Sequence, residues 1–181
     1  MTTLTPSLLV AAATSFVGIG EEGGDNRGQV VELFLREVRQ PPGQPWCAAF
    51  VHHVGFWSHW DHAIKKSSWP LPATASCWEL GEFARVRGVL FKDPAPGDVF
   101  LVFGKQFQRF AHTGVIAAVN RVLATPAGDT VFEATTVEGN TSDDGSREGR
   151  MTLTRTRRFS TRSGDRFIRW AELDQRQAKA A

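Results

Sequence analysis

Cysteine is the residue type in this chain best suited to nucleophilic chemistry, and one of its two cysteines stands at an informative position. Cys47 follows Pro45-Trp46 and opens a run of apolar residues and good helix formers that reaches Val54. This order predicts a thiol in the first turn of a helix, where unpaired backbone N–H groups and the helix dipole favour a thiolate. Such a cysteine has a lowered pKa and can act as a nucleophile. The alternative is a buried structural cysteine that begins a core helix.

A cysteine nucleophile needs a base close to its sulfur. Among the histidines, His112 is the best candidate, because it lies where a turn enters an apolar strand and a sheet edge can present its side chain. His52 and His53 lie five and six positions after Cys47 on the same predicted helix, so they would point away from the sulfur or lie more than a turn from it. We expect these two to face solvent or to pack against other residues. For His112 the alternative is a partly exposed histidine at the end of a strand.

A third group has to orient the base. Glu133 and Glu138 both follow His112, within the next predicted strand or at its end. Glu138 and Asn140 are separated by one residue, so the alternation of a strand would place both on the same face. One could hold His112 in the required tautomer while the other supports it or a reacting oxygen. These residues equally fit an ordinary strand end with Asn140 in the left-handed conformation, and they do not decide between the two glutamates.

Four short segments now stand in a definite order along the chain: Pro45–Val51, Pro96–Val99, His112–Ile116 and Glu138–Asn140. In this order they resemble the CHAP family (cysteine, histidine-dependent amidohydrolases/peptidases), a branch of the papain-like NlpC/P60 group of cell-wall hydrolases. The stretch at residues 20–28 and the helix predicted after it are similar to those of phage-associated and bacterial members that carry helices before the cysteine.

The resemblance implies a papain-like α+β fold and a role for each matching residue. Cys47 would be the nucleophile, His112 the general base and later the general acid, Glu138 the group that orients His112, and Asn140 its assistant. The implied reaction is hydrolysis of an amide in peptidoglycan through an acyl-enzyme, without a cofactor or metal. The bond would be either the N-acetylmuramoyl-L-alanine amide or one within the peptides.

Two departures from the family pattern are visible. The common His-Val-Gly is His112-Thr113-Gly114 in this chain. Some members carry an acidic calcium-binding loop before the cysteine, whereas residues 41–45 read Pro-Pro-Gly-Gln-Pro here, so we expect no calcium at that place. The acidic residues of the earlier loop, Glu21, Glu22 and Asp25, are better explained as solvated.

Five of the six tryptophans lie between residues 46 and 78. We expect most of them in the core, and we choose Trp46 and Trp69 as candidates for lining a substrate groove. A zinc site built from His52, His59 and His62 is a weaker alternative, because these residues form no fixed short metal-binding motif.

Helical patterns dominate the first half of the chain. Thr5-Pro6 fits an N-cap and N1 pair for a helix that runs to about Val17, with one apolar face formed by Leu4, Leu8, Ala12 and Phe16. Further helices are predicted at residues 29–39, 47–60 and 75–85. The stretch Leu8–Ala13 is apolar enough to resemble the core of a signal peptide, but no basic residue precedes it, so we read it as part of the first helix.

Short apolar runs bounded by turns dominate the second half. Strands are predicted at residues 99–103, 112–119, 130–137, 151–158 and 166–170. Helices first and strands afterwards predict an α+β domain with N-terminal helices packed on an antiparallel sheet. We expect one catalytic domain over residues 1–174 and a flexible tail at 175–181.

The composition limits the classes of partner. A net charge of +2 is too small to indicate nucleic acid, and no segment is long and apolar enough for membrane insertion. Two cysteines do not make a disulfide framework, so we expect reduced thiols. We expect a monomer made in the cytoplasm without a recognisable signal peptide. It would act on peptidoglycan at the cell wall after export or lysis by another system, with a delivery or immunity protein as a further partner. The rival is a non-catalytic wall-binding or phage structural module that keeps the fold.

Overall fold

The computed structural model describes residues 5–126, 128–142 and 149–173. The predicted tail at 175–181 lies outside these residues. Helices occupy the first half of the chain, each within about three residues of its predicted limits: α1 (Pro6–Thr14), α2 (Gln29–Glu37), α3 (Cys47–Ser58) and α4 (Cys77–Val86). Proline at the first position of α1 and a Ser76 hydroxyl that accepts from the Glu79 N–H of α4 explain where these two helices begin.

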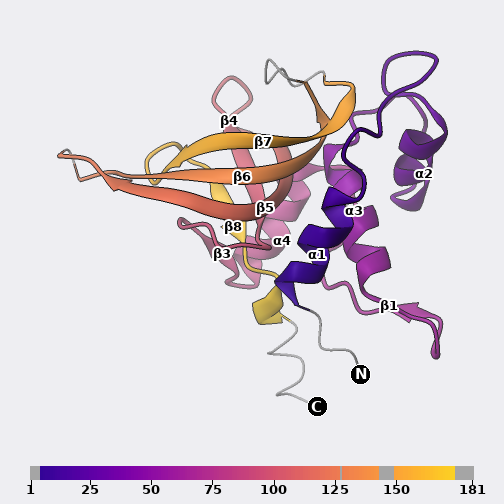
Figure 1. Cartoon of the computed structure of the whole chain (residues 1–181), viewed down its shortest axis with the longest axis horizontal. Coiled ribbons are helices and arrows are strands. Elements are labelled where there is room, and N and C mark those ends of the chain that lie inside the picture. The colour runs from indigo at the N-terminus through magenta and orange to yellow at the C-terminus, as the bar shows by residue number, and fades with distance from the viewer. Residues whose placement is uncertain (1–4, 127, 143–148, 174–181) are drawn as a thin grey trace.

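Strands follow the helices and form an antiparallel sheet in the order β3-β8-β4-β5-β6-β7. Their bounds are β3 (Leu90–Phe91), β4 (Val99–Gly104), β5 (Arg109–Ala124), β6 (Thr130–Thr141), β7 (Met151–Ser160) and β8 (Arg166–Ile168). The α+β class with an antiparallel sheet is therefore confirmed (Figure 1). The short β3 and the hairpin of β1 (Trp60–Asp61) and β2 (Lys66–Ser67) were not predicted, since two-residue strands carry no periodic signal.

Helix α3 is the centre of the helical layer. It packs against β5 and β6 of the sheet, and α1 and α2 pack against it in turn (Figure 1). Every residue from Cys47 to Gly55 is buried, so the helix is enclosed by protein around most of its circumference. A helix that is apolar on all sides requires such surroundings.

Two glycines let neighbouring elements approach closely. A Cβ on Gly55 of α3 would lie 2.2 Å from the indole of Trp69, which therefore packs directly on the helix backbone. Gly97, in the turn before β4, has a φ of +86° and lies against Pro6 at the start of α1. The indole N–H of Trp170 donates to the Gly97 carbonyl at 2.8 Å, so this turn joins α1 to the end of the sheet.

The buried face of α1 differs from the predicted one. Leu9 and Ala13 are fully buried, whereas Leu8 is 40% exposed, and Leu4 lies outside the described residues. The run Leu8–Ala13 is apolar at every position, so it offers two adjacent stripes with nearly equal hydrophobicity. Packing of α1 against α3 and the sheet buries the stripe that contains Leu9. The sequence periodicity alone cannot indicate which of the two stripes is buried.

Candidate active site

Cys47 is the first residue of α3, as predicted, and only 4% of its surface is exposed. The first hydrogen bond of the helix runs from the Phe50 N–H to the Trp46 carbonyl at 2.8 Å. The N–H groups of the residues before Phe50 thus have no acceptor within the helix. One of them, the Ala48 N–H, interacts with the Cys47 sulfur.

His112 lies within β5 and is 8% exposed, which places it deeper than a strand-end position. Its Nε2 is 2.8 Å from Oε2 of Glu138. The other ring nitrogen, Nδ1, is buried and has no well-aligned hydrogen bond, while the Cys47 sulfur interacts with the ring. The imidazole therefore joins the thiol to the carboxylate, and one nitrogen remains available for proton transfer.

Glu138 is fully buried in β6, and it is the glutamate that contacts the histidine. Glu133 instead stands opposite Arg121 and Arg158 in the sheet register. Besides His112, the Glu138 carboxylate accepts hydrogen bonds from the Thr136 hydroxyl at 2.5 Å and from Nε and Nη2 of Arg157 at 2.5 and 2.6 Å. The two-pronged contact with Arg157 fixes the plane of the carboxylate.

The charges in this network alternate in sign. A hydrogen bond with Cys77, then the hydrogen bond and charge of His112, hold the pKa of Cys47 well below its usual value despite burial. Burial alone would lower the pKa of His112, but Cys47 and Glu138 outweigh it and raise this pKa to about 9. Burial alone would raise the pKa of Glu138, but His112 and Arg157 lower it to about 2. These shifts favour a Cys47 thiolate beside a protonated His112 and an ionised Glu138.

Asn140 does not join this network. It has a φ of 54°, and the pairing of β6 with β7 shifts register between Glu138 and Thr141. Because this irregularity breaks the alternation, Asn140 leaves the face that Glu138 occupies. In the orientation that satisfies both amide atoms, its nitrogen donates to the Gly149 carbonyl at 2.6 Å and its oxygen accepts from the Trp46 N–H at 3.3 Å. It secures the segment before Cys47 rather than the ring of His112.

Neither tryptophan chosen for substrate contact is placed to make one. Trp46 is 0% exposed, packs beside Phe34 and donates through Nε1 to Glu21 at 3.0 Å. Trp69 is 9% exposed and packs against His59 and Trp170. Both tryptophans belong to the core, where burial of their large apolar rings stabilises the fold. The tryptophan that faces the site is Trp78, which is 51% exposed.

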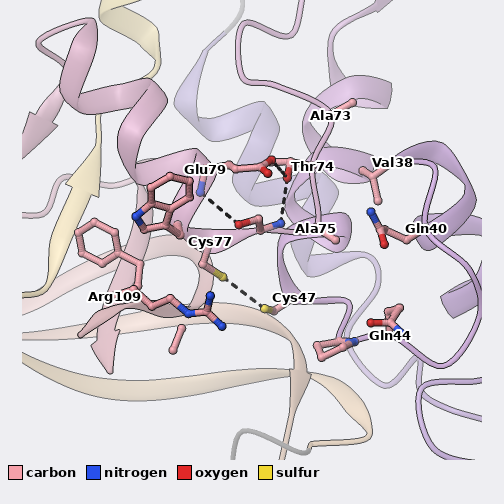
Figure 2. A pocket seen from close by; sticks show the side chains of 15 residues that line it. Val38, Gln40, Gln44, Cys47, Ala73, Thr74, Ala75, Cys77, Glu79 and Arg109 are labelled. Carbon is pink, nitrogen blue, oxygen red and sulfur yellow. Dashed lines mark hydrogen bonds between the residues drawn. The ribbon is translucent and has the colours of Figure 1, made fainter. Parts of the chain in front are cut away.

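A pocket of about 350 Å³ opens at Cys47. Figure 2 shows Cys47 and Cys77 side by side at its inner wall, with Sγ atoms 3.7 Å apart and no disulfide between them. Cys77 is the first residue of α4, so two helix N-termini meet at the sulfurs. Other lining residues come from the segment before Cys47, from α4 and its preceding loop, and from β5: Gln40, Gln44, Thr74, Trp78, Glu79 and Arg109.

The remaining histidines have structural surroundings. His53 lies 2.8 Å from Glu37 through Nδ1, and its neighbour His52 is also buried, so packing rather than solvent exposure describes both. Burial lowers the pKa of His59 to about 4, and its ring packs between Trp69 and Trp170. Across residues 5–126, 128–142 and 149–173, no three His, Cys, Asp or Glu side chains are grouped as a metal site.

Sequence reasoning missed three partners of the predicted residues: Cys77, Thr136 and Arg157. Thr136 precedes Glu138 by two positions and shares its face of β6, which the alternation could have indicated. Arg157 and Cys77 depend on strand register and helix packing, which local patterns do not contain.

Comparison with protein-family models, curated proteins and solved structures finds no match to this chain. In the described part of the chain, no helix is both long and apolar enough to cross a membrane.

Proposed function

We propose that this protein is a cysteine-dependent hydrolase that cleaves an amide bond of peptidoglycan, and that its α+β architecture is papain-like. The observation that carries the hydrolase proposal is the position of His112 between the buried Glu138 carboxylate and the Cys47 thiol, which lines a pocket. Nucleophile, base and orienting group in contact are the arrangement that acyl transfer needs. Peptidoglycan as the substrate rests on the order of the four sequence segments and their resemblance to the CHAP family.

In the first half-reaction the Cys47 thiolate attacks the carbonyl carbon of the scissile amide and forms the carbon–sulfur bond. The developing oxyanion can be stabilised by N–H groups of the first turn of α3, which lack helical acceptors. His112, charged in the resting state, donates its Nδ1 proton to the leaving nitrogen. The carbon–nitrogen bond breaks, the amine departs and the acyl group remains on the sulfur.

In the second half-reaction the neutral imidazole removes a proton from water through Nδ1. The hydroxide attacks the thioester carbonyl, the carbon–sulfur bond breaks, and the thiolate and imidazolium return. Throughout, the hydrogen bond to Glu138 keeps the Nε2 proton in place, so Nδ1 is the nitrogen that exchanges protons. Arg157 and Thr136 hold that carboxylate still.

The proposal covers both an N-acetylmuramoyl-L-alanine amidase and a peptidoglycan endopeptidase, since both use the same catalytic groups. The protein would act as a monomer at the cell wall after delivery by another system. Peptidoglycan is its proposed partner, with a delivery or immunity protein as a further one.

The test is digestion of purified peptidoglycan with mass spectrometry of the released products, which identifies the cleaved bond. Cys47→Ala and His112→Ala should release no new amino termini while the circular dichroism spectrum stays intact. His62→Ala is the matched control, because His62 is exposed and lies outside the pocket lining. Undiminished release by Cys47→Ala would refute the mechanism. Binding of peptidoglycan by the wild type without release of termini would identify a non-catalytic module.

A further inference from the structure

Among the described residues that line the pocket, Glu79 is the one carboxylate side chain and Arg109 the one basic side chain. The Glu79 carboxylate accepts a hydrogen bond from the Thr74 hydroxyl at 2.5 Å. The backbone of Arg109 pairs with Gly104, but its guanidinium makes no hydrogen bond or ion pair with another residue of the described ranges. A guanidinium that faces a pocket and pairs with no carboxylate among the described residues can bind an anionic group of a ligand.

The strand fixes the backbone of Arg109, and its side chain is exposed. It is the first residue of β5, three positions before His112, and it stands opposite Gly104 of β4. The next residue, Phe110, packs into the space at Gly81, where a Cβ would lie 2.4 Å from the ring. In Figure 2 the guanidinium of Arg109 extends into the pocket on the side of the two thiols, and Gln40 and Gln44 lie across from it.

We infer that Arg109 selects substrates that carry a free carboxylate next to the scissile amide. The substrate class is therefore an acidic peptide, such as a stem peptide whose acidic residue has an unmodified α-carboxyl group. A guanidinium offers two parallel N–H donors that match the two oxygens of a carboxylate. A carboxamide has one oxygen and no negative charge, so it cannot replace the carboxylate in that contact. This inference rests on the proposed function and adds its specificity.

The kinetic test uses two synthetic stem peptides that differ only in a free carboxyl or a carboxamide at the acidic residue. For the wild type, kcat/KM should be about 10- to 100-fold higher for the carboxylate peptide, as expected for a charge-assisted hydrogen bond. Arg109→Gln should lose this preference by slowing on the carboxylate peptide alone. Arg121→Gln is the matched control, since Arg121 is exposed on the same strand and does not line the pocket. Equal rates on both peptides for the wild type would overturn the inference.

A binding measurement separates this inference from the proposed function. Calorimetry with Cys47→Ala protein should give tighter binding of the carboxylate peptide, and the double variant with Arg109→Gln should bind both peptides equally. Discrimination in binding without turnover by the wild type would support the role of Arg109 and contradict the hydrolase. Turnover without discrimination in binding or rate would overturn the role of Arg109 and leave the hydrolase in place.

The two thiols carry a second, independent inference. Cys47 Sγ and Cys77 Sγ are 3.7 Å apart, each on the first residue of a helix, and both line the pocket. A disulfide has a sulfur–sulfur distance of about 2.0 Å, so each sulfur has to move by less than about 1 Å to form one. A low pKa at Cys47 and access through the pocket are the conditions that make a thiol reactive toward oxidants.

We propose that a low-molecular-weight disulfide, such as oxidised glutathione, joins Cys47 to Cys77 and so switches the nucleophile off. The Cys47 thiolate attacks one sulfur of the small disulfide, forms a mixed disulfide and expels one glutathione thiolate. Cys77, losing its proton, then attacks the Cys47 sulfur, which breaks the mixed bond and releases the second glutathione, protonated as the thiol. The two cysteines are oxidised and the small disulfide is reduced to two thiols.

Intact-mass spectrometry tests this step without any assay of hydrolysis. After treatment with oxidised glutathione the wild type should lose the mass of two hydrogens, retain no adduct and yield a Cys47–Cys77 cross-linked peptide that dithiothreitol reverses. Cys77→Ser protein should instead keep one glutathione on Cys47. A persistent glutathione adduct on the wild type, or no reaction at all, would overturn the proposal.

Discussion

Replacing Glu138 with glutamine tests the centre of the charged network. The substitution keeps the size of the side chain and removes its charge, so His112 and Arg157 lose the anion that lies between them. Because Glu138 is 0% exposed, water cannot replace the lost contacts. We therefore expect the change to affect the stability of the fold itself, independently of any catalytic activity.

The magnitude follows from the pKa of Glu138, which is lowered from 4.5 to about 2. Each pKa unit corresponds to about 1.4 kcal/mol, so the ionised carboxylate contributes about 3 kcal/mol to the free energy of unfolding at neutral pH. Removing one partner of a buried ion pair typically costs about 3–5 kcal/mol, which agrees in size. We expect Glu138→Gln to lose about 3 kcal/mol at pH 7.

The pH dependence has a definite sign. Because the pKa of Glu138 is lowered in the folded state, its contribution is complete above about pH 4.5 and is lost as the pH falls toward 2. The pKa of His112 is raised from 6.5 to about 9, so its contribution is complete below pH 6.5 and is lost as the pH rises through 9. The contributions of Glu138 and His112 are therefore both complete between about pH 4.5 and 6.5.

Urea unfolding followed by tryptophan fluorescence at pH 3, 5.5, 7 and 9.5 measures the loss of stability on both the acidic and the alkaline side. The difference between wild type and Glu138→Gln should be largest at pH 5.5 and should shrink at pH 3 and pH 9.5. Glu82→Gln is the control, because Glu82 also pairs with an arginine, Arg85, but at the surface of α4; its stability should be unchanged within error. Equal effects of the two substitutions at pH 7, or a difference that does not vary with pH, would refute the reasoning.

Three further outcomes are expected. Iodoacetamide should alkylate Cys47 rapidly below pH 7, and His112→Ala should move the rise in rate toward the ordinary thiol pKa of about 8.5, since the imidazolium helps to hold the thiolate; an unshifted profile in peptide-mapped alkylation would contradict this. Gly55→Ala should lower the free energy of unfolding by about 1–3 kcal/mol, because its Cβ meets Trp69, and an unchanged urea midpoint would be the contrary result. Asn140→Ala should be about 1 kcal/mol less stable than Asn140→Gly, because only alanine is strained at a φ of 54°, and denaturation showing equal stabilities would argue against that strain.

Local patterns predicted the parts of this structure that local physics determines. Pro45-Trp46 ahead of an apolar run placed Cys47 at the start of α3, and turn-bounded apolar runs placed the five longer strands. The contact between His112 and Glu138 followed from their predicted positions on neighbouring strands and from the family resemblance. The register of β5 with β6 places Glu138, and not Glu133, next to His112.

The errors arose where tertiary packing overrides a local rule. An irregular pairing near the end of β6 turned Asn140 away from the face of Glu138, which strict alternation does not anticipate. The side chains of Trp46 and Trp69 suit either a core or a substrate groove. Only the packing of the surrounding elements shows that both lie in the core. Cys77 is distant from Cys47 in sequence, and the meeting of two helix starts is a property of the assembled fold.

The segment before the nucleophile is fastened by elements from both ends of the chain. The Trp46 indole donates to Glu21, the Trp46 N–H donates to Asn140, and the loop of Glu21 is itself bonded to Arg150 near the start of β7. For protein engineering, this means that the minimal transferable unit is larger than the span from Cys47 to Glu138. A graft or truncation that starts at Pro45 would keep Cys47, His112 and Glu138 and lose the hydrogen bond from Trp46 to Glu21 at the start of α3.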